Sequence, residues 1–332
     1  MKQFLVIGKP LCRYCRYKKC QQIGMKINKA VKDEEFIEDP KPSAPVINSE
    51  YSEKYQVDFG KLFQTINLIF EAQQTPLFDT MQNHTKDFSK ILANFIEQTK
   101  SQGELKGMEK FSGALRYQFL ESYFIKIAQL LNQFRPFSVL PINDKLLLYK
   151  RFWQIFGTLE RSFQTCQQYG NNIEDKRLVI DSFHVIDLNF TKQIEGIQTG
   201  TDVFFIPFID KVKHVLIPFK KANITLFELS YMCQIALWSC YDILGLSEAT
   251  LKIAEEMINK TANDMHEYFI QELRMPYYAT RQSQLFKIVH YSEFICRVKQ
   301  QLLTAKEIFN FGNNAFAYCK FEQSYFDFVN KR

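Results

Sequence analysis

The residues with the clearest potential for chemistry stand near the N-terminus, where CRYCRYKKC occupies positions 12 to 20. Cys12 and Cys15 have the Cys-x2-Cys spacing that turns two thiolates towards one metal ion. A structural zinc site needs four ligands, and only Cys20 could supply a third one nearby. By spacing alone the pair is open to three interpretations: a zinc remnant, chance surface cysteines, or a redox pair.

Positive charge is concentrated in the same segment. The chain has 332 residues and a formal net charge of +6. Residues 1–30 contain lysines and arginines but no acidic residue, so the rest of the chain is slightly negative. Any contact with phosphates is therefore expected from this segment and not from the main body.

The composition predicts an all-α fold. Hydrophobic residues make up 46% of the chain, and 32 Phe and 16 Tyr stand against only 12 Gly and 10 Pro. Sandwiches and barrels need more turn residues than this. The apolar run near the start is too short for a signal peptide and no run is long enough to span a membrane, so we expect an intracellular protein without a membrane partner.

A proline-containing, charge-rich stretch divides the chain. Residues 28–57 show little periodicity and predict a flexible hinge. Helical periodicity begins at Phe59, so a compact domain is expected over residues 58–332.

Apolar spacing predicts the elements of that domain. Helices are expected over 115–134, 143–165, 227–244, 248–273 and 281–309, with a short terminal helix over 321–332 and a small hairpin over 177–190. Asn143 or Asp144 is expected to cap the second helix and Ser247 the fourth. The helix over 143–165 is apolar almost all round, which predicts a place in a middle layer.

The string CRYCRYKKCQQIGM resembles the end of the second zinc module of nuclear receptor DNA-binding domains. The resemblance implies that Cys12 and Cys15 are the last two zinc ligands and that Cys20 is a non-ligating cysteine. It also implies a basic helix that faces DNA phosphates through Arg13, Arg16, Lys18 and Lys19. Because only eleven residues precede Cys12, the zinc site is expected to be incomplete. Residues 1–27 then form a remnant with weak phosphate attraction or none.

The main body resembles the ligand-binding domain of the same family. FSVLPINDKLLLYKRFWQIF, which begins at Phe137, is similar to the family's F-x-x-L-x-x-x-D-[QK] segment, in the form of the divergent nematode receptors. The resemblance implies a three-layer helical sandwich with one small β-hairpin.

Two sites follow from this resemblance. An apolar ligand pocket is implied at Tyr117, Leu120, Tyr123, Ile127, Trp153 and Phe156. These residues are equally consistent with a filled core. In the family, a Leu-rich coregulator helix docks in an apolar groove, with a lysine at its C-terminal end and a glutamate at its N-terminal end. The corresponding groove residues here are Asn132, at the usual lysine position, with Lys145 and Asp327 as substitutes.

The helix over 281–309 matches the family's dimerisation helix, although its apolar stripe is equally consistent with a core face. The predicted function is an orphan nuclear-receptor transcription regulator, located in the nucleus, that contacts coregulators and forms a homodimer or a heterodimer. The alternatives are a ligand-independent interaction or dominant-negative protein that does not bind DNA itself, and a carrier of small apolar molecules. Zinc and an unknown apolar ligand are the implied cofactors. No motif of an enzyme is present in the sequence, so an enzyme is not expected.

Overall fold

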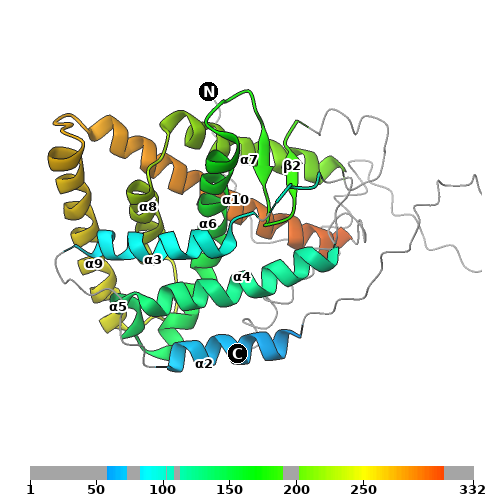
Figure 1. Ribbon diagram of the computed structural model, residues 1–332. Coiled ribbons are helices and arrows are strands. Elements are labelled where there is room, and N and C mark those ends of the chain that lie inside the picture. The colour runs from blue at the N-terminus through cyan, green and yellow to red at the C-terminus, as the bar shows by residue number, and fades with distance from the viewer. Residues whose placement is uncertain (1–57, 73–82, 102, 108–112, 190–201, 310–332) are drawn as a thin grey trace, which may run out of the picture. The chain divides into compact units, whose positions relative to one another are not determined.

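The computed structural model describes residues 58–72, 83–101, 103–107, 113–189 and 202–309. All of them belong to one compact unit, Tyr51–Arg332. Most of them lie in helices, and the two described strands form a single antiparallel sheet (Figure 1). The predicted all-α class with one small hairpin is confirmed. The predicted boundaries at residues 27 and 57 lie outside the described residues and stay predictions.

The elements follow one another in chain order with short connections between most of them. They are α2 (Phe59–Glu71), α3 (His84–Thr99), α4 (Gly113–Gln133), α5 (Arg135–Ser138), α6 (Ile142–Tyr169), β1 (Arg177–Val179), β2 (Val185–Asp187), α7 (Asp202–Ala222), α8 (Leu226–Trp238), α9 (Glu248–Glu267), the π-helix η3 (Tyr268–Glu272) and α10 (Ala279–Phe309).

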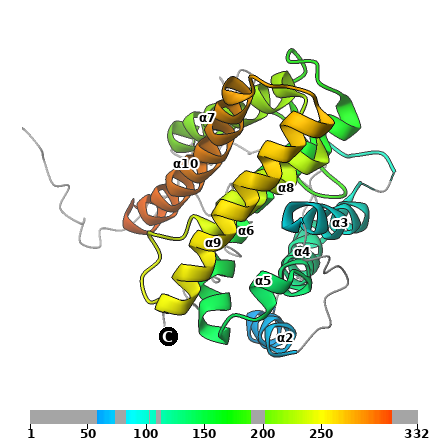
Figure 2. The same cartoon turned by 90° about the vertical axis from the view of Figure 1, so that its left-hand side faces the viewer.

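These helices form three layers, as the two views in Figures 1 and 2 show. The middle layer contains α6, α8 and α9, with α3 and α4 on one side and α7 and α10 on the other. Helix α8 is buried from Glu228 to Trp238 because it packs against α3, α6, α9 and α10. The predicted three-layer sandwich is therefore confirmed, with α6 in the middle layer.

The hairpin lies against the C-terminal half of α6. Leu178 pairs with Ile186, and the backbone N–H of Val179 donates to the hydroxyl of Thr165 at 3.0 Å. Its turn is built on the buried carboxylate of Asp181, which accepts hydrogen bonds from the backbone N–H and the ring of His184. The bond to Thr165 thus attaches the hairpin to α6, and the buried polar turn stabilises the hairpin itself.

The cap predicted for α6 was wrong, and the cap predicted for α9 is confirmed. Helix α6 begins at Ile142, with Pro141 at its N-cap, so Asp144 lies inside the first turn. Its buried carboxylate accepts from the hydroxyls of Ser247 and Thr250, at 2.5 Å in each case. Ser247 in turn caps α9 by accepting from the backbone N–H of Thr250 at 3.2 Å. Asp144 therefore joins two helices of the middle layer instead of capping one.

Helix α7 was not predicted, because its sequence contains Pro207 and Pro218. Proline removes a backbone donor and disfavours the helix interior. Val215, Leu216 and Phe219 of this helix are buried, so tertiary packing offsets the local cost of the prolines. Helix α8 also ends at Trp238, earlier than predicted, while α9 continues into the π-helix η3.

We expect Asp144→Ala to lower the free energy of unfolding by about 2–3 kcal/mol, because the buried hydroxyl of Thr250 and the half-buried hydroxyl of Ser247 lose their acceptor. Asn143→Ala, at the exposed neighbouring position, is the matched control and should stay within about 0.5 kcal/mol of the parent chain. Chemical denaturation followed by circular dichroism measures both variants. Equal losses would contradict the role given to Asp144.

Candidate functional site

Helix α2 lies outside the three layers, where its main contacts are with α4 and α6 (Figure 1). The face that it turns towards them is apolar, with Leu62, Ile66 and Phe70 buried at four-residue intervals and Phe63 buried beside them. This spacing is that of one face of an α-helix. The surface formed by α4 and α6 therefore receives the apolar face of an amphipathic helix, and we call this docking surface the groove between α4 and α6.

Aromatic side chains form one end of this groove. The ring of Phe70 lies 5.5 Å from that of Phe137 and 5.4 Å from that of Tyr149, in an edge-to-face arrangement with the latter. The hydroxyl of Tyr149 donates to the carbonyl of Phe124 at 2.9 Å, which fixes the ring between α4 and α6. Such aromatic pairs stabilise the packing of α2 by more than the burial of their surface area alone.

Asn132 and Lys145 bind the C-terminal end of α2. The side-chain amide of Asn132 donates to the carbonyls of Ile69 and Ala72, at 2.6 and 3.1 Å. The ammonium of Lys145 donates to the carbonyl of Phe70 at 2.8 Å and to Oδ1 of Asn132 at 3.3 Å. The last carbonyls of a helix have no partner within the helix and carry its negative dipole end. These two side chains supply the missing donors.

Lys145 is a buried cation, with only 4% of its surface exposed. Within the described part of the chain it forms no ion pair, and its partners are the carbonyl of Phe70 and the amide of Asn132. Burial lowers the pKa of its ammonium. Chemically, the arrangement is a receptor for the C-terminal end of an apolar helix.

The structure thus brings two of the predicted groove residues together. Asn132 comes from the end of α4 and Lys145 from the first turns of α6. Asp327 lies outside the described residues, so its role stays a prediction. Sequence reasoning missed the presence of α2 at this groove. The four-residue spacing of Leu62, Ile66 and Phe70 was the available signal.

The residues predicted to line a ligand pocket meet in the core between α4 and α6. Their burial is nearly complete for Leu120, Tyr123, Ile127, Trp153 and Phe156. The side chain of Tyr117 lies outside the described residues. Aromatic rings pack closely here: the ring of Phe95 lies 5.4 Å from Tyr123 and 5.1 Å from Phe156. The described side chains at these positions form closely packed core.

A buried polar cluster closes this region on the side of α3. The carboxylate of Glu160 accepts from the hydroxyl of Tyr123 at 2.7 Å and from the guanidinium of Arg161 at 2.6 Å. Gln164 donates to the same carboxylate and to the hydroxyl of Thr99. Burial, together with the charge of Glu160, raises the pKa of the Tyr123 phenol well above its ordinary value, so the hydroxyl stays a donor.

Arg161 is held as a cation by the same cluster. Burial alone would lower the pKa of its guanidinium, but the neighbouring charge of Glu160 raises it instead. Its Nη2 donates to the carbonyl of Thr99, and its guanidinium lies over the rings of Phe119 and Tyr123. The buried ion pair lies within α6, and its hydrogen bonds to Tyr123 and Thr99 bind α4 and α3 to that helix.

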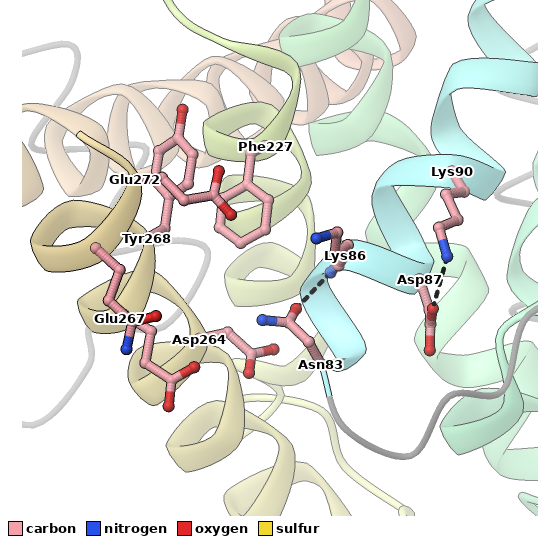
Figure 3. Close-up of a pocket in the computed structure, with 10 residues that line it drawn as sticks. Asn83, Lys86, Asp87, Lys90, Phe227, Asp264, Glu267, Tyr268 and Glu272 are labelled. Carbon is pink, nitrogen blue, oxygen red and sulfur yellow. Dashed lines mark hydrogen bonds and ion pairs between the residues drawn. The ribbon is translucent and has the colours of Figure 1, made fainter.

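A separate cleft of about 360 Å³ lies between the start of α3 and the end of α9 (Figure 3). Lysines of α3 face carboxylates of α9 across it, and the carboxylate of Asp264 accepts from the backbone N–H of Thr85 at 2.8 Å. Burial raises the pKa of Asp264. Charges of both signs line the cleft, and none of the predicted site residues belongs to it.

The predicted zinc and phosphate residues lie outside the described residues. This applies to Cys12, Cys15, Arg13, Arg16, Lys18 and Lys19. Among the residues that the structure describes, no group of histidine, cysteine and acidic side chains could hold a metal ion. In the same residues, no helix is long and apolar enough to cross a membrane.

On α10, most of the apolar stripe belongs to the core. Leu285, Ile288 and Ile295 are buried, whereas Phe294 is exposed. The helix packs against α6, α7 and α8. These contacts support the interpretation of the stripe as a core face. The side chain of Leu302, the last residue of the stripe, lies outside the described residues.

The fold is a three-layer helical sandwich with a groove that receives a helix. Residues 104–309 match the family described as the ligand-binding domain of nuclear hormone receptor. The chain is also similar to three nuclear hormone receptor family members of Caenorhabditis elegans. It is 24% identical to nhr-127, over 86% of this chain and 82% of that protein. The identity to nhr-130 is 26%, over 78% of this chain and 61% of that protein. The identity to nhr-90 is 23%, over 83% of this chain and 75% of that protein.

Since the match to the family covers more than half of the chain, the protein belongs to the nuclear hormone receptor family, in its divergent nematode branch. Membership identifies it as a transcription regulator of the nuclear receptor type, a class whose members are generally not enzymes. Dimerisation and coregulator partnering are general properties of such domains.

We expect Glu160→Gln to lower the free energy of unfolding by about 3–5 kcal/mol, because Arg161 is then left as a buried charge without a counter-ion. Glu97→Gln removes a carboxylate that pairs with Lys100 on an exposed surface, and this control should cost less than about 1 kcal/mol. Thermal and urea denaturation of both variants measure the difference. A loss no larger than that of the control would show that the ion pair does not hold α3, α4 and α6 together.

Proposed function

We propose that this protein regulates transcription in the nucleus by binding coregulator helices in the groove between α4 and α6. The observation that carries the proposal is the pair formed by Asn132 and Lys145. Their N–H groups donate to the terminal carbonyls of α2, and the apolar face of α2 packs in the groove. Recognition of an amphipathic helix combines an apolar groove with polar groups at the ends of the bound helix.

The chemistry of the groove supports binding of a helix and not of an extended peptide. An extended strand would need unpaired backbone groups along a sheet edge. The groove offers side chains of α4 and α6, whose own backbone groups are used within those helices, and donors at one end. A partner therefore needs apolar residues at three- and four-residue intervals and free carbonyls at its C-terminal end.

We propose that regulation through this groove does not depend on a bound apolar ligand. The close ring packing around Tyr123, Phe156 and Phe95 favours this mode, since these rings occupy the region in which a ligand pocket was predicted. The polar groups of Glu160 and Gln164 also find partners within the chain. Among the described side chains, a ligand at this position would have to displace the rings of Phe95, Tyr123 and Phe156.

Fusion of the whole chain to a DNA-binding module with a known target tests the proposed function. The fusion should accumulate in the nucleus and change reporter output relative to the module alone, without an added ligand. Lys145→Gln should weaken coregulator binding about tenfold, because the carbonyls of the bound helix lose a charged donor. The reporter effect should fall accordingly.

Lys252→Gln, at an exposed position on α9, is the matched control and should behave as the parent chain. A reporter output equal to that of the DNA-binding module alone would contradict the proposed function. An effect that survives Lys145→Gln unchanged would place the coregulator contact on another surface.

A further inference from the structure

The groove between α4 and α6 is filled by a segment of the same chain. We propose that α2 is an autoinhibitory helix, an internal occupant that a coregulator helix must displace before it can bind. This inference rests on the proposed function, because the displaced contact is the coregulator groove. It adds a mode of regulation that depends on the chain itself.

The two faces of α2 differ as those of a docked peptide do. Leu62, Ile66 and Phe70 are buried in the groove. The opposite face is open to solvent, and Leu68 on it is 65% exposed. Helix α2 thus contributes one apolar face to α4 and α6 and is not enclosed between layers. Helix α2 is therefore amphipathic, as the proposed coregulator helix must be.

The end of α2 is held by polar groups that do not depend on its sequence. Asn132 and Lys145 donate to backbone carbonyls of Ile69, Phe70 and Ala72 and to no side chain of α2. Any helix that ends at this point presents the same carbonyls. The receptor end of the groove is therefore equally suited to α2 and to a helix from another protein.

The charge of Lys145 limits the net stability of the contact. Among the described residues no carboxylate pairs with this ammonium, and its hydrogen bonds to the carbonyl of Phe70 and the amide of Asn132 offset only part of its desolvation. When α2 leaves, this ammonium returns to water. The loss of hydration therefore offsets part of what these hydrogen bonds contribute to docking, whereas the charge of Arg161 in the core is paired with Glu160.

Covalent attachment decides how strongly α2 competes. Residues 73–82 join α2 to α3 along the chain. Attachment within one chain generally raises the local concentration to about 1 mM, so α2 outcompetes a free helix of equal intrinsic affinity. A coregulator helix then succeeds when it binds more tightly or when another event releases α2.

A peptide that copies α2 provides the test. Fluorescein-labelled peptide of residues 58–72 is titrated with the full chain, and anisotropy reports binding. Ile66→Asp in the chain introduces a charge into the docked face and should release α2, so this variant should bind the peptide at least about tenfold more tightly than the parent chain. Leu68→Asp, on the exposed face, is the matched control and should bind as the parent chain does.

Circular dichroism and thermal unfolding establish that the Ile66→Asp chain is folded. A second design does not depend on a substitution in α2. A site for a specific protease is placed within residues 73–82, the folded chain is cleaved, and gel filtration at low concentration follows the N-terminal fragment. Release of the fragment, with a gain in peptide binding, is the expected result. A fragment that stays bound after cleavage and dilution would make α2 a permanent part of the core and overturn the inference.

The outcomes separate this inference from the proposed function. If the Ile66→Asp chain binds the α2 peptide tightly while the fusion to the DNA-binding module leaves reporter output unchanged, the α2 contact stands and the coregulator function fails. If the reporter responds but parent and Ile66→Asp chains bind the peptide equally well, the coregulator function stands and α2 is not its inhibitor.

Discussion

A buried ammonium has to be solvated by the protein, and Lys145 is solvated by the end of a helix. Its donors go to the carbonyl of Phe70 and to the amide of Asn132. Asn132 completes the arrangement by binding the neighbouring carbonyls of α2. The position of the C-terminal end of α2 and the helix-binding character of the groove both depend on this contact.

The layers are joined to one another by polar side-chain contacts, whereas α2 is joined to them by its apolar face and its terminal carbonyls. Asp144 links α6 to α9, Glu228 forms a partly buried ion pair with Arg281 and links α8 to α10, and Gln234 links α8 to both α3 and α9. Each link uses side chains on both partners. Among the contacts of the described residues, α2 is held to α4 and α6 by its apolar face and its backbone carbonyls, as expected of an element that can leave while the sandwich stays folded.

Local signals in the sequence predicted much of this structure. The apolar spacing of α4, α6, α9 and α10, the hairpin and the cap at Ser247 depend on near neighbours along the chain. Helix α7 escaped prediction because Pro218 disfavours a helix locally, whereas Phe219 is buried by distant partners.

The site was predictable only in part. The resemblance to the family indicated Asn132 and Lys145, which the fold brings within 3.3 Å of each other. It did not indicate what they bind, because the contact with α2 joins residues more than sixty positions apart. The ion pair of Glu160 and Arg161 was also missed. Adjacent charged residues in a helix usually face water, and only the packing of α3 and α4 over them shows that they are buried.

Hydrogen exchange of the intact chain, measured by mass spectrometry with and without a saturating Leu-rich helical peptide, distinguishes displacement of α2 from binding elsewhere. If the peptide displaces α2, exchange of the α2 amides accelerates while the amides of α8 stay protected. Peptide that binds at the groove while α2 keeps its full protection would contradict displacement, because both helices cannot occupy the same groove.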